Sequence, residues 1–157
     1  MIPFYNFIAW SGTGKTTYLE RLVAELKARG ARVAVVKHDA HRFEIDREGK
    51  DSWRFARAGA DVVAIADGEK RALMEYRPVT SLKQLLSGIC DVDLILVEGW
   101  HAEAVNAIAL HRAGSGKPLK LPPEKCVAVV SDTPLETGDT PLFPLDDPAP
   151  MADFLLA

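Results

Sequence analysis

The chain is predicted to adopt an α/β fold with a mostly parallel sheet flanked by helices. Three observations lead to this prediction. Short apolar runs alternate with helical patterns along the 157 residues, which is typical of βαβ units. A glycine-rich turn follows the first apolar run, and an amphipathic helical pattern follows that turn. A later apolar run, Leu94–Val97, ends on the acidic residue Glu98.

The expected elements follow in chain order. The first strand covers Phe4–Ile8, and a helix starts near Lys15 and stops before Gly30. That helix is identified by one apolar stripe of helical spacing: Leu19, Leu22, Val23 and Leu26. Further strands are expected at Arg32–Lys37, Val62–Ala66, Asp93–Gly99, Asn106–Leu110 and Cys126–Val130. Short helices are expected from Asp51 or Ser52 to Arg57, at Ser81–Leu86 and at Ala152–Leu156, after a proline-rich tail that wraps the surface.

Composition sets the broad class of the protein. The length suits a single domain over residues 1–157, and the net charge of −3 gives no basic excess of the kind that nucleic-acid binders show. No apolar run is long enough to span a bilayer, and the start of the chain lacks the basic residues of a signal peptide, so we expect a cytoplasmic protein. Cys90 and Cys126 each adjoin apolar residues, which predicts buried thiols rather than a disulfide.

The most specific motif is the turn after the first strand, Ala9-Trp10-Ser11-Gly12-Thr13-Gly14-Lys15-Thr16-Thr17. It fits the P-loop pattern G-x-x-x-x-G-K-[ST] except at Ala9, whose methyl group is tolerable only if its φ is negative. A glycine-rich turn without a ligand is the alternative. The glycines let backbone amides approach an anion, Lys15 places a cation on the terminal phosphates, and the Thr16 hydroxyl can ligate Mg²⁺. We therefore expect a P-loop NTPase type of fold, with these phosphate-binding residues: Ser11, Gly12, Thr13, Gly14, Lys15, Thr16 and Thr17.

Acidic residues supply the other half of the predicted site. Glu98 is expected to hold Mg²⁺ and to act with Lys15 in catalysis, although it could simply end its strand. Asp51 is a second candidate for the Mg²⁺ shell or an N-cap of its helix, and Asp39 and Asp46 are further candidates. The guanine-reading pattern Asn-Lys-x-Asp is absent. Asp132, which follows an apolar strand, could still accept hydrogen bonds from a guanine base, or it could merely end that strand.

The polar segment from Lys37 to Lys50 is open to three interpretations. It could be a solvated loop, or Lys37, His38 and Arg42 could contact a phosphate. His38 and His41 with Asp39 could instead bind a transition metal, but no strong third and fourth ligands are evident.

Taken together, these motifs resemble the molybdopterin-guanine dinucleotide biosynthesis protein B (MobB) family. The resemblance covers most of the chain and is carried by the P-loop, by Lys37–Phe43 and Asp46, by Gly49–Arg54 and Ala58–Ala60, and by Leu94–Trp100. It implies a GTP-binding adapter with Mg²⁺ and weak GTP hydrolysis, whose phosphate and Mg²⁺ roles fall on Lys15, Thr16 and Glu98. It also implies a homodimer with an extended shared sheet. The implied partners are the MobA-type guanylyltransferase that attaches GMP to molybdopterin, and molybdopterin itself.

Two departures from the family pattern stand out. Ala9 replaces the usual glycine. Trp100-His101 and Asn106-Ala107 stand where the family tends to have Phe-Lys and Pro-Lys, so two positive charges are lost near a region that could meet a pterin phosphate. Other functions remain open from the residues: a small-molecule kinase or ATP-dependent ligase whose 38–42 segment grips the acceptor, or a metallochaperone GTPase. The sequence shows no obvious arginine finger or water-orienting glutamine, which agrees with weak turnover.

Overall fold

The computed structural model describes residues 2–38 and 43–157, which form two compact units. The first unit combines residues up to His38 with Leu86–Ala157, and the second lies within Asp39–Leu85. Three residues considered above, Asp39, His41 and Arg42, lie outside the described residues. Within the described chain, no helix is both long and apolar enough to cross a membrane.

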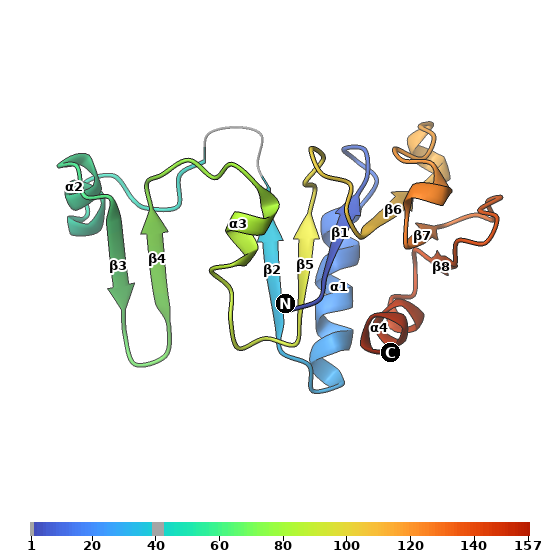
Figure 1. Cartoon of the computed structure of the whole chain (residues 1–157), viewed down its shortest axis with the longest axis horizontal. Helices are drawn as coiled ribbons and strands as arrows, with labels where there is room; N and C mark the ends of the chain where they lie inside the picture. The colour runs from blue at the N-terminus through green and yellow to red at the C-terminus, as the bar shows by residue number, and fades with distance from the viewer. Residues whose placement is uncertain (1, 39–42) are drawn as a thin grey trace. The chain divides into compact units, whose positions relative to one another are not determined.

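The first unit is built on a six-stranded sheet in the order β2-β5-β1-β6-β7-β8, in which every neighbouring pair is parallel (Figure 1). This confirms the predicted α/β fold with a mostly parallel sheet. β1 and β5 lie side by side, so the chain segments that follow them meet at the same edge of the sheet. The strands are β1 (Phe4–Ile8), β2 (Val33–Lys37), β5 (Leu94–Glu98), β6 (Ala107–His111), β7 (Ala128–Ser131) and β8 (Leu142–Pro144).

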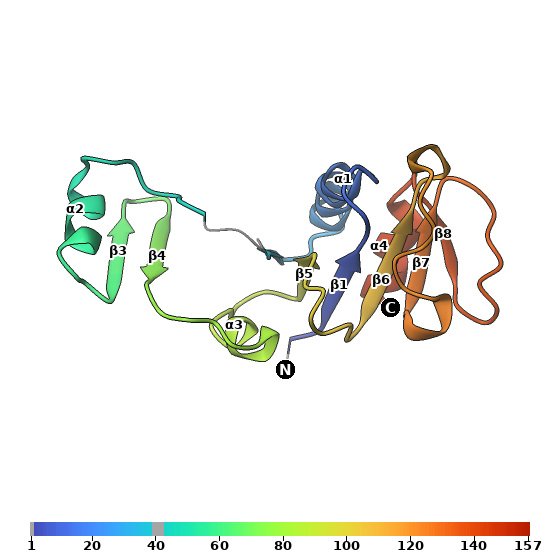
Figure 2. The same cartoon turned by 90° about the horizontal axis from the view of Figure 1, so that it is seen from above.

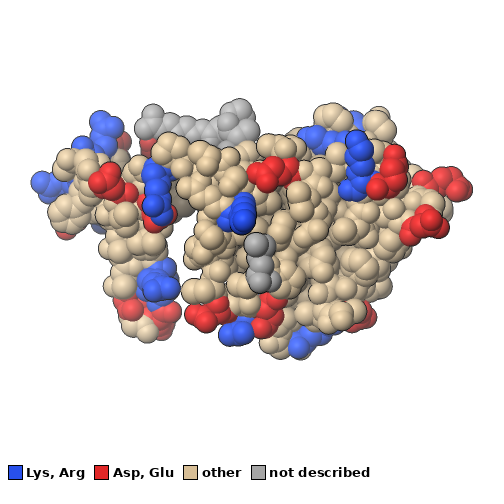
Figure 3. All heavy atoms as spheres, viewed as in Figure 1, with Lys and Arg blue, Asp and Glu red and all other residues tan. Residues whose placement is uncertain are grey.

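Two helices, α1 (Lys15–Ala28) and α4 (Ala149–Leu156), contact each other and cover one face of this sheet (Figure 2). The predicted stripe of α1 faces the core, with Leu22 and Leu26 fully buried. Gly30 follows the end of α1 with a φ of +83°, a conformation that suits glycine. On the opposite face, drawn in Figure 3, the surface over these strands carries few charged side chains between its edges.

The second unit contains α2 (Asp51–Arg57), the strands β3 (Val62–Ala66) and β4 (Arg71–Glu75), and most of α3 (Leu82–Leu86). β3 and β4 form a separate antiparallel hairpin, so β3 does not join the parallel sheet that the alternating pattern suggested. β4 was not predicted. Its turn begins at Asp67-Gly68, where the Asp67 carboxylate accepts hydrogen bonds from the amides of Glu69 and Lys70 at 2.8 Å. An Asp-Gly pair between apolar runs is a hairpin signal.

Two further differences concern details of the first unit. β8 lies in the tail that was expected only to wrap the surface, and it pairs with β7. Both cysteines are free, but Cys90 is exposed and Cys126 is half-buried, so the expectation of two buried thiols was wrong. Cys90 lies outside the described helices and strands, between α3 and β5.

Candidate functional site

The P-loop connects β1 to α1 and has the backbone that its glycines predict. Gly12 and Gly14 have φ values of +84° and +90°, and Gly14 caps the N-terminus of α1. The Thr13 hydroxyl and amide both donate to the Trp10 carbonyl, at 2.8 and 3.3 Å, which closes the loop from inside. Asp91 and Asn106 are the described non-glycine residues with positive φ, so Ala9 has a negative φ and its methyl group is accommodated.

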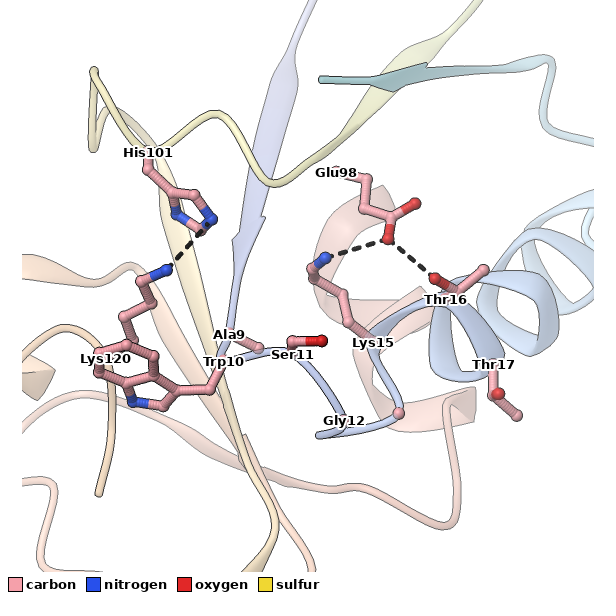
Figure 4. Close-up of a pocket in the computed structure, with 11 residues that line it drawn as sticks. Ala9, Trp10, Ser11, Gly12, Lys15, Thr16, Thr17, Glu98, His101 and Lys120 are labelled. Carbon is pink, nitrogen blue, oxygen red and sulfur yellow. Dashed lines mark hydrogen bonds and ion pairs between the residues drawn. The ribbon is translucent and has the colours of Figure 1, made fainter. Parts of the chain in front are cut away.

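Lys15 and Thr16 converge on Glu98 (Figure 4). Glu98 ends β5 beside Phe7 of the neighbouring strand β1, which brings its side chain to the start of α1. Its Oε1 atom accepts hydrogen bonds from Lys15 Nζ at 3.0 Å and from the Thr16 hydroxyl at 2.8 Å. Three residues that the sequence predicts to act together are therefore in direct contact.

The ionisation of Glu98 follows from these contacts. Burial alone raises the pKa of a carboxyl group, but here the hydrogen bonds from Lys15 and Thr16 and the charges of Lys15 and Lys37 outweigh burial and lower the pKa of Glu98 below 4.5. Glu98 is therefore a carboxylate at neutral pH. A carboxylate and a hydroxyl 2.8 Å apart are hard oxygen donors of the kind that Mg²⁺ prefers, so this pair fits that ion.

A cavity of about 520 Å³ surrounds this cluster. All of the predicted phosphate-binding residues except Thr13 line it, and three residues from outside the motif, Glu98, His101 and Lys120, complete its wall. Thr13 is absent from this lining because its side chain is buried beneath the loop. The described residues of the lining are Ala9, Trp10, Ser11, Gly12, Gly14, Lys15, Thr16, Thr17, Glu98, His101 and Lys120.

Two residues that were not predicted from the sequence form hydrogen bonds with the backbone around the cavity. Asn6 is fully buried in β1, and its Nδ2 donates to the carbonyls of Trp100 and Glu103 at 2.7 and 3.0 Å, while its Oδ1 accepts from the Trp100 amide at 3.2 Å. Arg112, just after β6, donates from Nε to the Thr13 carbonyl at 2.9 Å. A single Asn within an apolar strand could have indicated Asn6 as a buried polar residue with a specific role. Nothing in the sequence indicates that Arg112 contacts the P-loop.

The remaining predicted residues lie outside this cavity lining. Asp132 follows β7 and accepts a hydrogen bond from the Ala113 amide at 2.8 Å, so it caps the turn after β6. Asp51 is the first residue of α2 in the second unit, where its exposed carboxylate lies 3.9 Å from Arg54. In that unit Asp46 accepts from the Ser52 hydroxyl at 3.0 Å.

Lys37 ends β2 in register with Glu98 and is exposed. His38 packs its ring against Trp100, with ring centroids 4.5 Å apart. Within the described part of the chain, no group of three His, Cys, Asp or Glu side chains is placed to hold a metal ion.

The known proteins that are similar to this chain come from one family. The family model described as "Molybdopterin guanine dinucleotide synthesis protein B" matches residues 4–132. The molybdopterin-guanine dinucleotide biosynthesis adapter protein of Haemophilus influenzae is 41% identical over 98% of this chain and 88% of its own length. The adapter protein of the same description from Escherichia coli is 40% identical, over 99% and 93%. Among solved structures, that of Bacillus subtilis MobB superposes with a TM-score of 0.75 at 27% identity, over 99% of this chain and 96% of that one.

Proposed function

The chain belongs to the molybdopterin guanine dinucleotide synthesis protein B family and is an adapter protein of molybdopterin guanine dinucleotide biosynthesis, and we propose that it performs this role by binding GTP with Mg²⁺ in its P-loop. The observation that carries the proposal is the convergence of Lys15 and Thr16 on Glu98 at the mouth of the P-loop. The relatives reported above are named adapter proteins, which gives no support to the kinase, ligase or metallochaperone alternatives.

The phosphate chain would lie over the N-terminus of α1, where the loop amides and the helix dipole favour anions. Lys15 would exchange part of its contact with Glu98 for a contact with the terminal phosphates. Ser11 and Thr17 would donate hydrogen bonds from their hydroxyl groups. Thr16 and Glu98 would hold Mg²⁺ at the same edge. When bound, Mg²⁺ supplies positive charge that offsets the charge of the phosphate oxygens. Asp132 would accept hydrogen bonds from the guanine base.

Hydrolysis of the bound nucleotide would be slow. Lys15 and the loop amides stabilise negative charge that develops on the γ-phosphate, and positioning supplies most of the effect. Among the described residues that line the cavity, none is an arginine or a glutamine that could stabilise the transition state or orient a water. Lys15 and Glu98 would then act as the catalytic residues of a weak GTPase.

We further propose that the chain acts as a single P-loop domain over residues 1–157, in the cytoplasm, as a homodimer. The second unit supports the dimer, because its hairpin exposes the large apolar residues Val62, Ile65 and Leu73. A two-stranded hairpin is marginally stable in isolation, so these side chains favour a covering surface. The partner enzyme would be the MobA-type guanylyltransferase that attaches GMP to molybdopterin, with molybdopterin itself as a possible ligand of the assembly.

Nucleotide titration tests the proposal. Calorimetric titration with GTP and ATP in the presence of Mg²⁺ should show binding to the wild-type protein, with GTP preferred. Lys15→Ala should weaken it by ten-fold or more, since a charge-assisted hydrogen bond contributes roughly 1.5–3 kcal/mol. Lys125→Ala, at an exposed lysine outside the cavity, is the matched control. Equal affinity of Lys15→Ala and Lys125→Ala would contradict the proposal.

A further inference from the structure

A second basic group faces the P-loop across the cavity. Lys120 Nζ lies 3.3 Å from His101 Nε2, and both side chains line the cavity that Lys15 and Glu98 share (Figure 4). We propose that Lys120 and His101 form a second phosphate-binding subsite that takes a terminal phosphate group: the γ-phosphate of the nucleotide or the phosphate monoester of a second substrate. The inference rests on the proposed function, because it places this group next to a nucleotide in the P-loop.

The spacing brings the two halves of the cavity together. Gly99 follows Glu98 with a φ of +78°, and a Cβ atom built on it would lie 3.7 Å from Lys15 Nζ and 3.8 Å from His101 Nε2. Both nitrogen atoms therefore flank one backbone position that carries no side chain. An anion held by Lys15 at this point is also close to the His101 ring.

The charge balance of the cavity favours an additional anion. Lys15 and Lys120 are the lysines of its lining, and Glu98 is its carboxylate. Glu98 is already paired with Lys15, and none of the ion pairs between described residues involves Lys120. Burial, followed by the charges of Lys120 and Lys15, lowers the pKa of His101, so its neutral ring can accept from one group and donate to another. A phosphate would offset the charge of Lys120.

Both side chains are held in place by residues of β1 and of the P-loop that follows it. The ammonium group of Lys120 lies 4.7 Å from the centroid of the Trp10 ring, a cation–π distance, and Trp10 Nε1 donates to the Pro118 carbonyl at 3.0 Å. The P-loop thus anchors the segment that carries Lys120. Asn6 fixes the backbone of Trp100, the residue before His101. A subsite whose donors are positioned before the ligand arrives loses less entropy on binding.

The test compares Lys120→Ala with Lys117→Ala. Lys117 is on the same segment and its ammonium group is 5.8 Å from the same Trp10 ring, but it does not line the cavity, so its removal changes the net charge equally. Affinities for GTP, for GDP and for inorganic phosphate added to the GDP-bound protein are measured by calorimetry with Mg²⁺. Lys120→Ala should lower either the affinity for GTP or the affinity for added inorganic phosphate by about five-fold, as expected for one partly exposed charged contact. Lys117→Ala should change both affinities little.

The outcomes separate the two sources of the phosphate. Weaker GTP binding with unchanged GDP binding assigns the subsite to the γ-phosphate. Unchanged nucleotide binding with loss of the added phosphate assigns it to a second substrate. His101→Ala should shift the same reading as Lys120→Ala. If Lys120→Ala matches Lys117→Ala in every titration, while Lys15→Ala still weakens nucleotide binding by ten-fold or more, the subsite is overturned and the proposed function stands.

If the wild-type protein binds no nucleotide, the proposed function fails, and inorganic phosphate titrated into the nucleotide-free protein still decides the subsite. Weaker phosphate binding by Lys120→Ala than by Lys117→Ala supports it, and equal binding overturns it.

Discussion

The two units of the chain have similar strand sequences and very different burial. β5 in the first unit reads Leu-Ile-Leu-Val-Glu, and all five residues are buried. β3 in the second unit reads Val-Val-Ala-Ile-Ala, yet only Val63 is buried, and β4 has no buried residue. β5 lies between two parallel neighbours, β2 and β1, whereas β3 has only the antiparallel partner β4. Apolar composition makes a strand available for burial, and neighbouring elements decide whether burial occurs.

This difference separates two tasks. The first unit has its own core, and every residue that lines the described cavity belongs to it. The second unit offers exposed apolar side chains and a charged helix, α2, which suits a surface that another chain covers. Nucleotide binding should therefore depend on the first unit, and self-association on the second.

The sharpest test of this comparison is core truncation. Leu22→Ala removes a fully buried side chain from α1 and should lower the free energy of unfolding by about 2–5 kcal/mol. Leu73→Ala removes a side chain that is 62% exposed and should change it by less than about 0.5 kcal/mol. Urea unfolding at low protein concentration measures both. Equal losses would show that the second unit has a core of its own.

Self-association provides the next largest effect. Leu73→Lys should weaken dimerisation by about ten-fold or more, because an unpaired ammonium group in an apolar interface costs more than roughly 1.4 kcal/mol. Sedimentation velocity over a range of concentrations measures the dissociation constant. Glu69→Gln, which changes the charge equally in the turn of the same hairpin, is the control. A Leu73→Lys variant that dimerises like Glu69→Gln would remove the second unit from the interface.

The same contrast explains what the sequence could predict. β1, α1 and β5 could be predicted from the sequence because their local pattern agrees with their burial in the fold. The apolar stripe of α1 and the continuous apolar run of β5 both face a core. The hairpin partner β4 was missed because Arg71–Glu75 has charged ends and no buried residue, so its position depends on the turn at Asp67 rather than on its own pattern.

Site prediction has a similar limit. Lys15, Thr16 and Glu98 were predictable because each is tied to a local motif at a strand end. His101 and Lys120 were not selected, since they reach the cavity through long-range contacts: Asn6 holds the backbone before His101, and Trp10 holds the segment of Lys120. Arg112 likewise meets the P-loop across 99 residues of sequence. Pairings of this kind follow from the order of strands in the sheet.

A smaller effect tests whether the first unit alone shapes the P-loop. Arg112→Ala removes the donor to the Thr13 carbonyl and leaves space beside Gly14, so nucleotide affinity should fall by about three- to five-fold through loss of loop order. Arg71→Ala, at an exposed arginine of the second unit, should leave affinity unchanged. Calorimetric titration with GTP and Mg²⁺ compares them. Equal affinities would mean that the loop keeps its shape without Arg112.

The smallest expected change is the pH dependence of the cluster around Glu98. Its carboxylate accepts hydrogen bonds from Lys15 and Thr16, and its pKa in the folded protein is lowered below 4.5. A lowered pKa means that this stabilisation is complete above about pH 4.5 and is lost as the pH falls through the folded-state value. The nucleotide-free wild-type protein should therefore exceed Glu98→Gln in free energy of unfolding at neutral pH, and the gap should narrow below pH 4.5. Denaturant titrations between neutral and acidic pH measure it. A gap that stays constant over that range would show that the carboxylate charge contributes nothing to the first unit, and that Lys15 needs no counter-charge to remain at the P-loop.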